Sequence, residues 1–241
     1  MTTERAVGTM LDWDSAFFGV PIGKAQAEIP SDVDATEAWA AHEGLRCVFL
    51  LLSADRLEVV QAAEKQGFFL TGVRITFERL VARELPAAPR QGVVVRAARN
   101  ADVAILEEIA AKSHRDTRFY ADPNFSRASC DRLYGTWIRR SCEGWADHVL
   151  TAENDGRLAG YITLHCRAEG QGVIGLVAVA ENSRRRGIGR RLVGAALEWF
   201  RDRDLQRAIV VTQAQNTGAL GLYYQAGFSV SRVDLWMHKW Y

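Results

Sequence analysis

The sequence has few residues of the kinds that mark a secreted, metal-stapled or nucleic-acid-binding protein. Its 241 residues contain four cysteines and five prolines, and 30 basic side chains face 29 acidic ones, a net charge of +1. No two cysteines have metal-ligand spacing, so we expect reduced, partly buried thiols and no metal. The near balance of basic and acidic side chains argues against a broad cationic surface for nucleic acid. It does not exclude a local basic pocket for phosphates.

Long apolar runs are also missing. The first residues lack the hydrophobic stretch of a signal peptide, and no run approaches the roughly 20 residues that a membrane span needs. Hydrophobic residues make up 48% of the chain and charged residues 24%, which is an ordinary globular composition with enough apolar side chains for a sizeable core. We therefore expect a soluble, cytoplasmic protein with no membrane partner.

A short stretch rich in proline and glycine divides the chain. Residues 82–92 carry two prolines and a glycine between two periodic regions, which is the composition of a linker. Chain length and this boundary predict a smaller N-terminal α/β domain over residues 1–85 and a larger domain over residues 91–241.

Beyond the linker the pattern mixes strands and helices. Asn154-Asp155-Gly156 is a strong signal for a tight hairpin. Asn100 is expected to cap a helix, and residues 114–127 read as a loop. Hydrophobic periodicity predicts strands at residues 93–95, 149–150, 160–164, 173–179, 209–211 and 228–240, and helices around residues 103–110, 133–138, 192–200 and 216–227.

The N-terminal region is similar to the end of the chain. When the sequence is shifted by 160 positions, residues 45–77 align with residues 205–237 without a gap, and Gly67-Phe68 falls on Gly227-Phe228. Both segments read strand, helix, Gly-Phe, strand. Two interpretations stay open: a degenerate half-repeat, or the chance recurrence of a common unit.

A glycine-rich turn follows the strand expected over residues 173–179. It reads Arg184-Arg185-Arg186-Gly187-Ile188-Gly189 and leads into an amphipathic helix. A helix N-terminus carries unpaired N–H groups and partial positive charge, and glycines let an anion approach the backbone. The turn therefore predicts a pyrophosphate cradle. It is neither a P-loop, which needs Gly-Lys-Ser/Thr, nor a dinucleotide fingerprint, because Leu192 stands where the third small residue would be.

A second signature lies downstream. Asn216-x-x-Ala219-x-x-Leu222-Tyr223 runs into Gly227-Phe228. In order, the two segments resemble the cofactor motifs of the GNAT superfamily of N-acetyltransferases. The resemblance implies an α/β (α+β) GNAT fold, with a mixed central sheet flanked by helices, and an N-terminal domain that resembles a half-GNAT. It also implies that the larger domain is an acetyl-CoA-dependent N-acetyltransferase.

The resemblance further implies residue roles. Tyr223 becomes the general acid for the departing thiolate, because a phenol with a reference pKa near 10 stays protonated at neutral pH. Tyr224 points about 100° away around the helix and is the weaker choice. The implied acetyl-CoA-binding residues are Leu176, Val177, Val179, Arg184, Arg185, Arg186, Gly187, Gly189, Arg190 and Asn216.

The acceptor side is less defined. Residues 11–19, 117–120 and 211–213 resemble a member of the superfamily that modifies a nucleotide sugar, which implies a nucleotide-linked amino sugar as acceptor. Arg115 and Arg118 could pair with an acceptor phosphate and Tyr120 could stack on a base or sugar; ordinary surface or core roles stay open for each.

The general base is not assigned. Residues 69–74 contain no carboxylate where that nucleotide-sugar enzyme has a proposed base, so either the base lies elsewhere or the acceptor differs. The remaining candidates are His165, Glu169, Asp116 and Asp122.

Two broader alternatives also stay open. The chain could acetylate another small amine or an antibiotic, or it could be a non-catalytic regulator that binds acyl-CoA. Trp236, His238 and Trp240 alternate on the last strand, so their shared face could line the cleft or a homodimer interface.

Overall fold

The computed structural model describes residues 7–81 and 92–241. Within them the strands form one ten-stranded mixed sheet in the order β1-β2-β3-β10-β4-β9-β8-β7-β6-β5. The pairs β2–β3 and β8–β9 are parallel, and the other neighbours are antiparallel. The strands are β1 (Gly8–Met10), β2 (Ile22–Ala27), β3 (Cys47–Ser53), β4 (Phe69–Leu80), β5 (Val93–Ala97), β6 (His148–Asn154), β7 (Arg157–Arg167), β8 (Gln171–Val179), β9 (Arg207–Gln213) and β10 (Ser229–Trp240).

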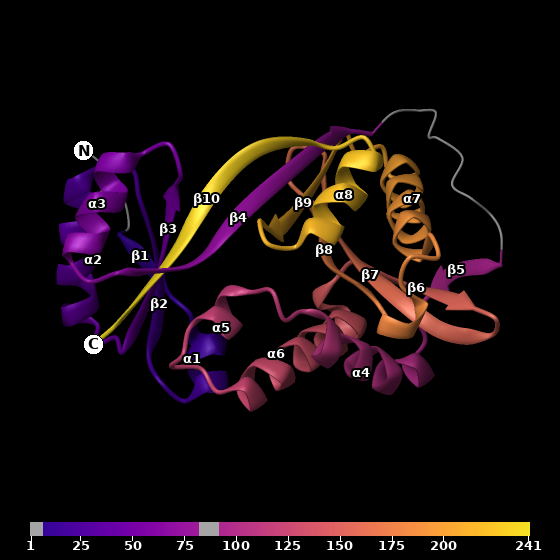
Figure 1. The fold of residues 1–241 in the computed structure, drawn as a ribbon, viewed down its shortest axis with the longest axis horizontal. Helices are drawn as coiled ribbons and strands as arrows, with labels where there is room; N and C mark the ends of the chain where they lie inside the picture. The colour runs from indigo at the N-terminus through magenta and orange to yellow at the C-terminus, as the bar shows by residue number, and fades with distance from the viewer. Residues whose placement is uncertain (1–6, 82–91) are drawn as a thin grey trace.

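Helices cover both faces of this sheet, which confirms the predicted mixed α/β class (Figure 1). The α-helices are α1 (Asp12–Phe18), α2 (Pro30–His42), α3 (Leu57–Lys65), α4 (Val103–Ser113), α5 (Arg118–Ala121), α6 (Arg127–Arg140), α7 (Ile188–Arg201) and α8 (Thr217–Gln225). Shorter helical turns are η1 (Asn100–Asp102), η2 (Ser141–Trp145) and η3 (Glu181–Ser183).

Three clusters of buried side chains hold the helices to the sheet. On one face, α2 and α3 pack against β3 through Val33, Val59 and Leu50, while α7 and α8 pack against β7 to β9 in a second cluster. On the other face, α1, α4, α5 and α6 share a third, aromatic-rich cluster with β3 and β10. The amphipathic pattern of α7 explains how the helix packs on the sheet, because its apolar stripe, from Ile188 to Phe200, is the buried side.

Strand β10 joins the two ends of the chain. It lies between β3 and β4, so the last strand of the chain completes the sheet of the N-terminal region. Figure 1 shows β4 and β10 as two long neighbouring strands that cross the middle of the molecule. Removing either strand would break hydrogen bonds in both regions. The division into domains 1–85 and 91–241 stays a prediction.

The bounds of three elements repeat at the shift seen in the sequence. Strand β3 and strand β9, helix α3 and helix α8, and strand β4 and strand β10 each begin and end 160 residues apart. Both Gly67 and Gly227 have a positive φ, at 86° and 80°, a conformation that glycine adopts without steric cost. Arg74 and Asp234 are also related by this shift of 160 residues, and they lie opposite each other at the centre of the β4–β10 ladder. The pairing of the two strands is therefore symmetric as well. The half-repeat itself stays a prediction.

Most predicted elements are present, and two local predictions were wrong. Asn100 does not cap α4: it starts the turn η1, and Asp102 ends that turn, with its carboxylate accepting the backbone N–H of Arg99 at 2.8 Å. Residues 114–127 are not all loop, because α5 forms within them and buries Phe119. The linker prediction falls outside the described residues except for Gly92.

Other predictions concern surface and chemistry. The hairpin at Asn154-Asp155-Gly156 is confirmed, with positive φ at Asp155 and Gly156. All four cysteines are free, two of them buried and two half-buried. Across the described ranges, no helix is both long and apolar enough to cross a membrane.

The shared strand predicts that both regions unfold together. Phe68 and Phe228 occupy matching positions in different clusters, exposed by 3% and 2%. Phe68→Ala and Phe228→Ala should each lower the free energy of unfolding by about 3–5 kcal/mol, because each leaves a cavity. Differential scanning calorimetry should show one transition, moved down by either variant. Leu80→Ala, at an exposed strand end, is the control; two transitions that shift separately would contradict the expectation.

Candidate active site

The site begins where β8 and β9 separate. The two strands pair from Gln171–Arg207 to Ile174–Val210. Past that point the paired register ends, while β8 continues to Val179 and β9 to Gln213. A break in the β7–β8 register falls at the same place, and the Leu176 N–H donates to Thr163 Oγ1 at 2.8 Å. Backbone N–H and C=O groups of β8 beyond Ile174 therefore border an opening on the β9 side.

Two pockets fill this opening. One, of about 480 Å³, extends from β8 to the glycine-rich turn. The other, of about 250 Å³, extends from β8 and β9 to α5. Both share Ser113, Asp116, Val177, Asn216, Ala219 and Tyr223. We call them the turn pocket and the inner pocket. Their shared lining makes them one continuous site.

The glycine-rich turn has the backbone that a cradle requires. Gly187 precedes α7 with φ 76°, and Arg185 also has a positive φ, 65°. The first hydrogen bond of α7 runs from the Arg191 N–H to the Gly187 carbonyl, so the N–H groups of residues 188–190 lie at the open helix end. Gly189 serves packing: a Cβ there would lie 3.1 Å from Leu222 of α8.

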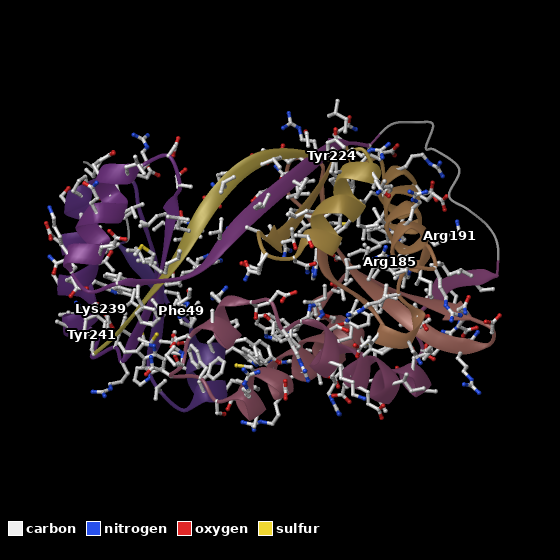
Figure 2. All side chains as sticks on the ribbon, viewed as in Figure 1. Phe49, Arg185, Arg191, Tyr224, Lys239 and Tyr241 are labelled. Carbon is white, nitrogen blue, oxygen red and sulfur yellow. The ribbon has the colours of Figure 1, made fainter. Side chains whose placement is uncertain are left out.

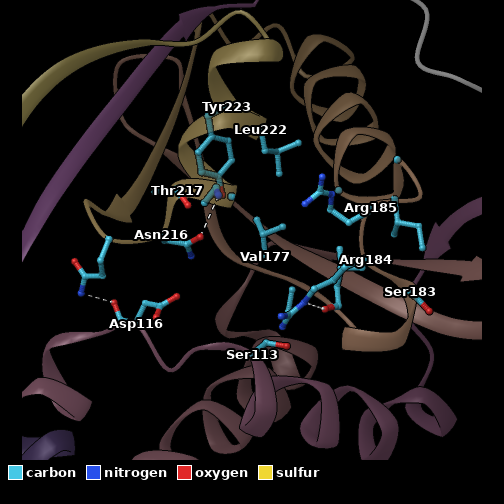
Figure 3. A pocket seen from close by; sticks show the side chains of 18 residues that line it. Ser113, Asp116, Val177, Ser183, Arg184, Arg185, Asn216, Thr217, Leu222 and Tyr223 are labelled. Carbon is cyan, nitrogen blue, oxygen red and sulfur yellow. Dashed lines mark hydrogen bonds between the residues drawn. The ribbon is translucent and has the colours of Figure 1, made fainter.

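The arginines of the turn divide into two sets. Arg184 and Arg185 line the turn pocket, and Arg184 Nε donates to the Val179 carbonyl at 3.2 Å (Figure 3). Arg186 is exposed and is not among the lining residues. Arg190 donates to the Gln225 side chain at 2.8 Å, which ties α7 to α8.

Helix α8 places Asn216 and Tyr223 at the junction of the two pockets. Asn216 caps the helix, since its Oδ1 accepts the Ala219 N–H at 3.0 Å. Tyr223 is 4% exposed, and burial raises the pKa of its phenol above the ordinary value. Tyr224 is 77% exposed and lies on the outer side of α8 (Figure 2). Figure 3 shows Asp116, Asn216 and Tyr223 around the same pocket.

The inner pocket carries buried polar atoms that find no partner among the described residues. These are Arg118 Nε and Gln213 Oε1. A buried polar group without a hydrogen bond costs about 1–3 kcal/mol, so such a group calls for an explanation such as a bound polar molecule. The inner pocket thus has the character of a polar binding site next to the thioester position that the family resemblance implies.

Of the three predicted acceptor residues, one lines the inner pocket and two do not. Arg118 lines it, and burial lowers the pKa of its guanidinium to about 10. Arg115 and Tyr120 are not among the residues that line either pocket. The Tyr120 hydroxyl instead donates to Asp131, and its ring stacks on Tyr134.

Of the four base candidates, Asp116 is the one that lines both pockets. Asp122 is buried and accepts hydrogen bonds from His238 Nδ1 at 2.7 Å and Trp240 Nε1 at 2.9 Å. His165 and Glu169 do not line the pockets. Trp236, His238 and Trp240 share one face of β10. This face contacts the aromatic-rich cluster and the loop after α5.

His114 was missed by the sequence analysis. It lines the inner pocket, stacks on Tyr134 and has Nε2 2.9 Å from the Tyr161 hydroxyl. Burial lowers the pKa of its imidazole to about 4. Its sequence neighbours give no periodic or motif signal, because the partners come from α6 and β7.

The fold and the two-pocket site agree with comparisons to known proteins. Residues 106–228, more than half of the chain, match the Acetyltransferase (GNAT) family. The chain therefore belongs to the GNAT family of acetyltransferases, as its two motifs predicted. The matched segment includes the glycine-rich turn, Asn216 and Tyr223.

Within this family, one relative matches along its whole length. A dTDP-fucosamine acetyltransferase of Escherichia coli O6:H1 is 28% identical over 240 residues, which cover 98% of this chain and 99% of the relative. The aligned part of this chain therefore includes the N-terminal region. The spore coat polysaccharide biosynthesis protein SpsD of Bacillus subtilis is 24% identical and covers 58% of this chain and 48% of its own length.

Solved structures show the same fold. A functionally unknown conserved protein from Staphylococcus epidermidis has a TM-score of 0.67 at 13% identity and covers 99% of this chain and 92% of its own. A GCN5-related N-acetyltransferase from Sphaerobacter thermophilus has a TM-score of 0.64 at 18% identity, covering 91% and 73%. Among the described residues, no group of three or more His, Cys, Asp or Glu could hold a metal ion.

The two buried histidines predict acid sensitivity. Burial lowers the pKa of both His114 and His238 to about 4, against an ordinary value of 6.5. Between these values the unfolded chain binds protons that the native protein does not, so stability rises with pH across this window. Above about pH 6.5 the free energy of unfolding should be at its full value with respect to these histidines. Below that pH, each histidine should lower it by up to about 1.4 kcal/mol per pH unit.

Urea unfolding at pH 5 and pH 7 measures this difference. His114→Gln and His238→Gln should each reduce it, whereas His42→Gln, whose side chain is 84% exposed, should leave it unchanged. An equal pH difference in the wild type and in both buried variants would contradict the assignment.

Proposed function

We propose that this chain transfers the acetyl group of acetyl-CoA to the primary amine of a nucleotide-linked amino sugar. The observation that carries the proposal is the junction at Tyr223, where the turn pocket meets the inner pocket. A pyrophosphate-binding turn on one side and a polar pocket on the other suit a reaction between two separate substrates. The full-length similarity to a dTDP-fucosamine acetyltransferase supports the acceptor class.

The turn pocket fits the cofactor. The open N–H groups of residues 188–190 and the partial positive charge of the α7 N-terminus would hold the pyrophosphate, with Arg184 and Arg185 adding charge. The backbone of Val177 and Val179, which line this pocket, would pair with the pantetheine arm. Leu176 lines the inner pocket, and its N–H is already bonded to Thr163 Oγ1 of β7. Arg186 and Arg190, at the rim, would add to the positive field.

The inner pocket would receive the amine. Acetyl-CoA supplies a thioester whose carbonyl carbon the neutral amine attacks, forming the C–N bond as the C–S bond breaks. A backbone N–H of β8 would stabilise charge on the carbonyl oxygen. Asp116, directly or through water, would take the proton that the amine loses.

Tyr223 would stabilise the leaving thiolate as general acid. Its raised pKa keeps the hydroxyl protonated at neutral pH, so it has a proton to donate to sulfur. Asn216 fixes the start of the same helix and therefore the position of Tyr223. Arg118 would contact the acceptor from α5. Arg115 and Tyr120 would contact it only outside the two pockets.

Removal of one hydroxyl tests the role of Tyr223. Tyr223→Phe should lower kcat by about 10²- to 10⁴-fold, the usual contribution of a positioned acid, while acetyl-CoA affinity stays within twofold by calorimetry. Tyr224→Phe, on the exposed side of the same helix, is the matched control and should keep full turnover. Unchanged turnover in Tyr223→Phe would remove this residue from the acid role.

An acceptor panel tests the function itself. The wild-type protein should release CoA from acetyl-CoA with dTDP- or UDP-linked amino sugars and much more slowly with aminoglycosides. Preference for an aminoglycoside would favour antibiotic acetylation. Acetyl-CoA binding without CoA release for any amine would favour a regulator and refute the proposed activity.

A further inference from the structure

A row of polar side chains crosses the sheet beside the inner pocket. Gln213 of β9 lies opposite Arg74 of β4, Arg74 lies opposite Asp234 of β10, and Asp234 lies opposite Ser53 of β3. Directly opposed residues point to the same face of a sheet. Gln213 also lines the inner pocket, so the row leads from the acetyl-transfer site into the N-terminal region.

Cations gather along this row. Lys24 Nζ lies 5.6 Å and Arg118 Cζ 4.2 Å from the ring centroid of Trp236, which is 6% exposed. Trp236 lies opposite Gly72, two residues before Arg74 on the same face. Lys24 and Arg118 therefore flank one aromatic ring, and Arg74 lies two residues along the same face of the sheet, near enough for its charge to act on Lys24. We call these three residues the cationic trio.

Few carboxylates balance these charges. Asp234 is shared, since its Oδ2 lies 3.7 Å from Arg74 Nη1 and 3.0 Å from Arg232 Nε. Asp14 is half-buried; burial raises the pKa of its carboxyl, and the nearby Arg118 opposes that shift. Burial, followed by the nearby Arg74, Arg118 and Arg232, lowers the pKa of Lys24. The cluster thus holds like charges together at a cost that a bound anion would relieve.

Free hydrogen-bonding capacity exists at the same place. A Cβ on Gly72 would lie 3.0 Å from the Gln213 Oε1 and 3.7 Å from the Arg118 Cβ, so glycine lets both side chains approach the strand. Arg118 Nε is buried without a partner among the described residues. The guanidinium is therefore anchored by aromatic rings and keeps donor capacity for a ligand.

The separation from the reacting centre suits one sugar ring. Neighbouring paired strands lie about 4.8 Å apart, so two strand intervals separate β4 from β8 by roughly 10 Å where the strands pair. The separation is larger at the level of Arg74 and Gln213, where β8 and β9 no longer pair. A sugar that places its amine near β8 would direct its anomeric oxygen towards β4. Beyond the trio, a hollow of about 230 Å³ lined by Ser53, Arg56, Arg232 and acidic neighbours has mixed charge, which suits ribose and base rather than phosphate.

We infer that Lys24, Arg74 and Arg118 bind the diphosphate of the acceptor, so that the N-terminal region selects nucleotide-linked amines. The inference rests on the proposed function for the identity of the acceptor, but the diphosphate site can be tested without turnover. Lys24 and Arg74 both lie in the N-terminal region, outside the segment that matches the family. They are binding residues and do not touch the reacting atoms.

Binding of dTDP alone tests the site. Calorimetry is done on the full chain with saturating CoA, which occupies the turn pocket, so that dTDP cannot bind there. Lys24→Gln and Arg74→Gln should each raise the Kd for dTDP roughly tenfold or more, as expected for loss of a charge-assisted hydrogen bond. Lys65→Gln, at an exposed lysine at the end of α3, is the matched control and should leave the Kd unchanged. Thermal unfolding confirms that each variant is folded.

Different outcomes separate this inference from the proposed function. Acetylation of a nucleotide amino sugar with no dTDP binding, or with equal dTDP affinity in both variants and the wild type, would refute the diphosphate site and leave the function standing. Binding of dTDP that the variants weaken, without acetylation of any nucleotide sugar, would support the site and refute the function. Inorganic pyrophosphate should compete with dTDP; a failure to compete would place the recognition in the nucleoside and overturn the role of the trio.

Discussion

The antiparallel pairing of β4 with β10 is the constraint on which the rest of the structure depends. Each strand also pairs with an element of the other region, β4 with β9 and β10 with β3. The ladder is centred on the opposed pair of Arg74 and Asp234. Because backbone hydrogen bonds fix register, a shift of one residue would turn Trp236 and Arg74 to the wrong face. One ladder therefore sets both the continuous sheet and the polar row next to the site.

The second requirement is the early end of the β8–β9 pairing. Two parallel strands that stayed paired over their whole length would leave no backbone free for a substrate. Here the pairing ends at Ile174 and Val210, and α7 and α8 begin beyond the separated ends. The opening is bordered by a helix N-terminus on one side and by Tyr223 on the other. This arrangement suits a thioester substrate between two fixed elements.

The matching bounds of α3 and α8 bear on the N-terminal region, which has no cofactor motif. Helix α3 matches helix α8 in length and position along the chain, but Ala63 stands where Tyr223 would be. Under the half-repeat prediction, the first copy supplies strands and cations rather than catalysis. The proposed diphosphate site lies beside the β4–β10 ladder, where Arg74 is opposite Asp234.

The sequence could predict what depends on neighbouring residues along the chain. Apolar periodicity located β8, α7 and α8, and the spacing of Gly187, Gly189 and Tyr223 identified the family. It could not tell which of Arg115, Arg118 and Tyr120 lines the inner pocket, because α5 is a single short turn whose orientation is set by packing on Phe49 and Trp236. His114 was missed for a related reason, since its partners come from distant elements.

The amino-acid sequence by itself determined the family, most helices and strands beyond the linker, and the glycine-rich turn, since each rests on local conformation and on motif spacing. The tertiary structure decided the insertion of β10 between β3 and β4, and with it the meeting of Lys24, Arg74 and Arg118. These three residues are separated by tens of positions and share no pattern. Long-range strand register places Arg74, and contact with one tryptophan places Lys24 and Arg118 beside it.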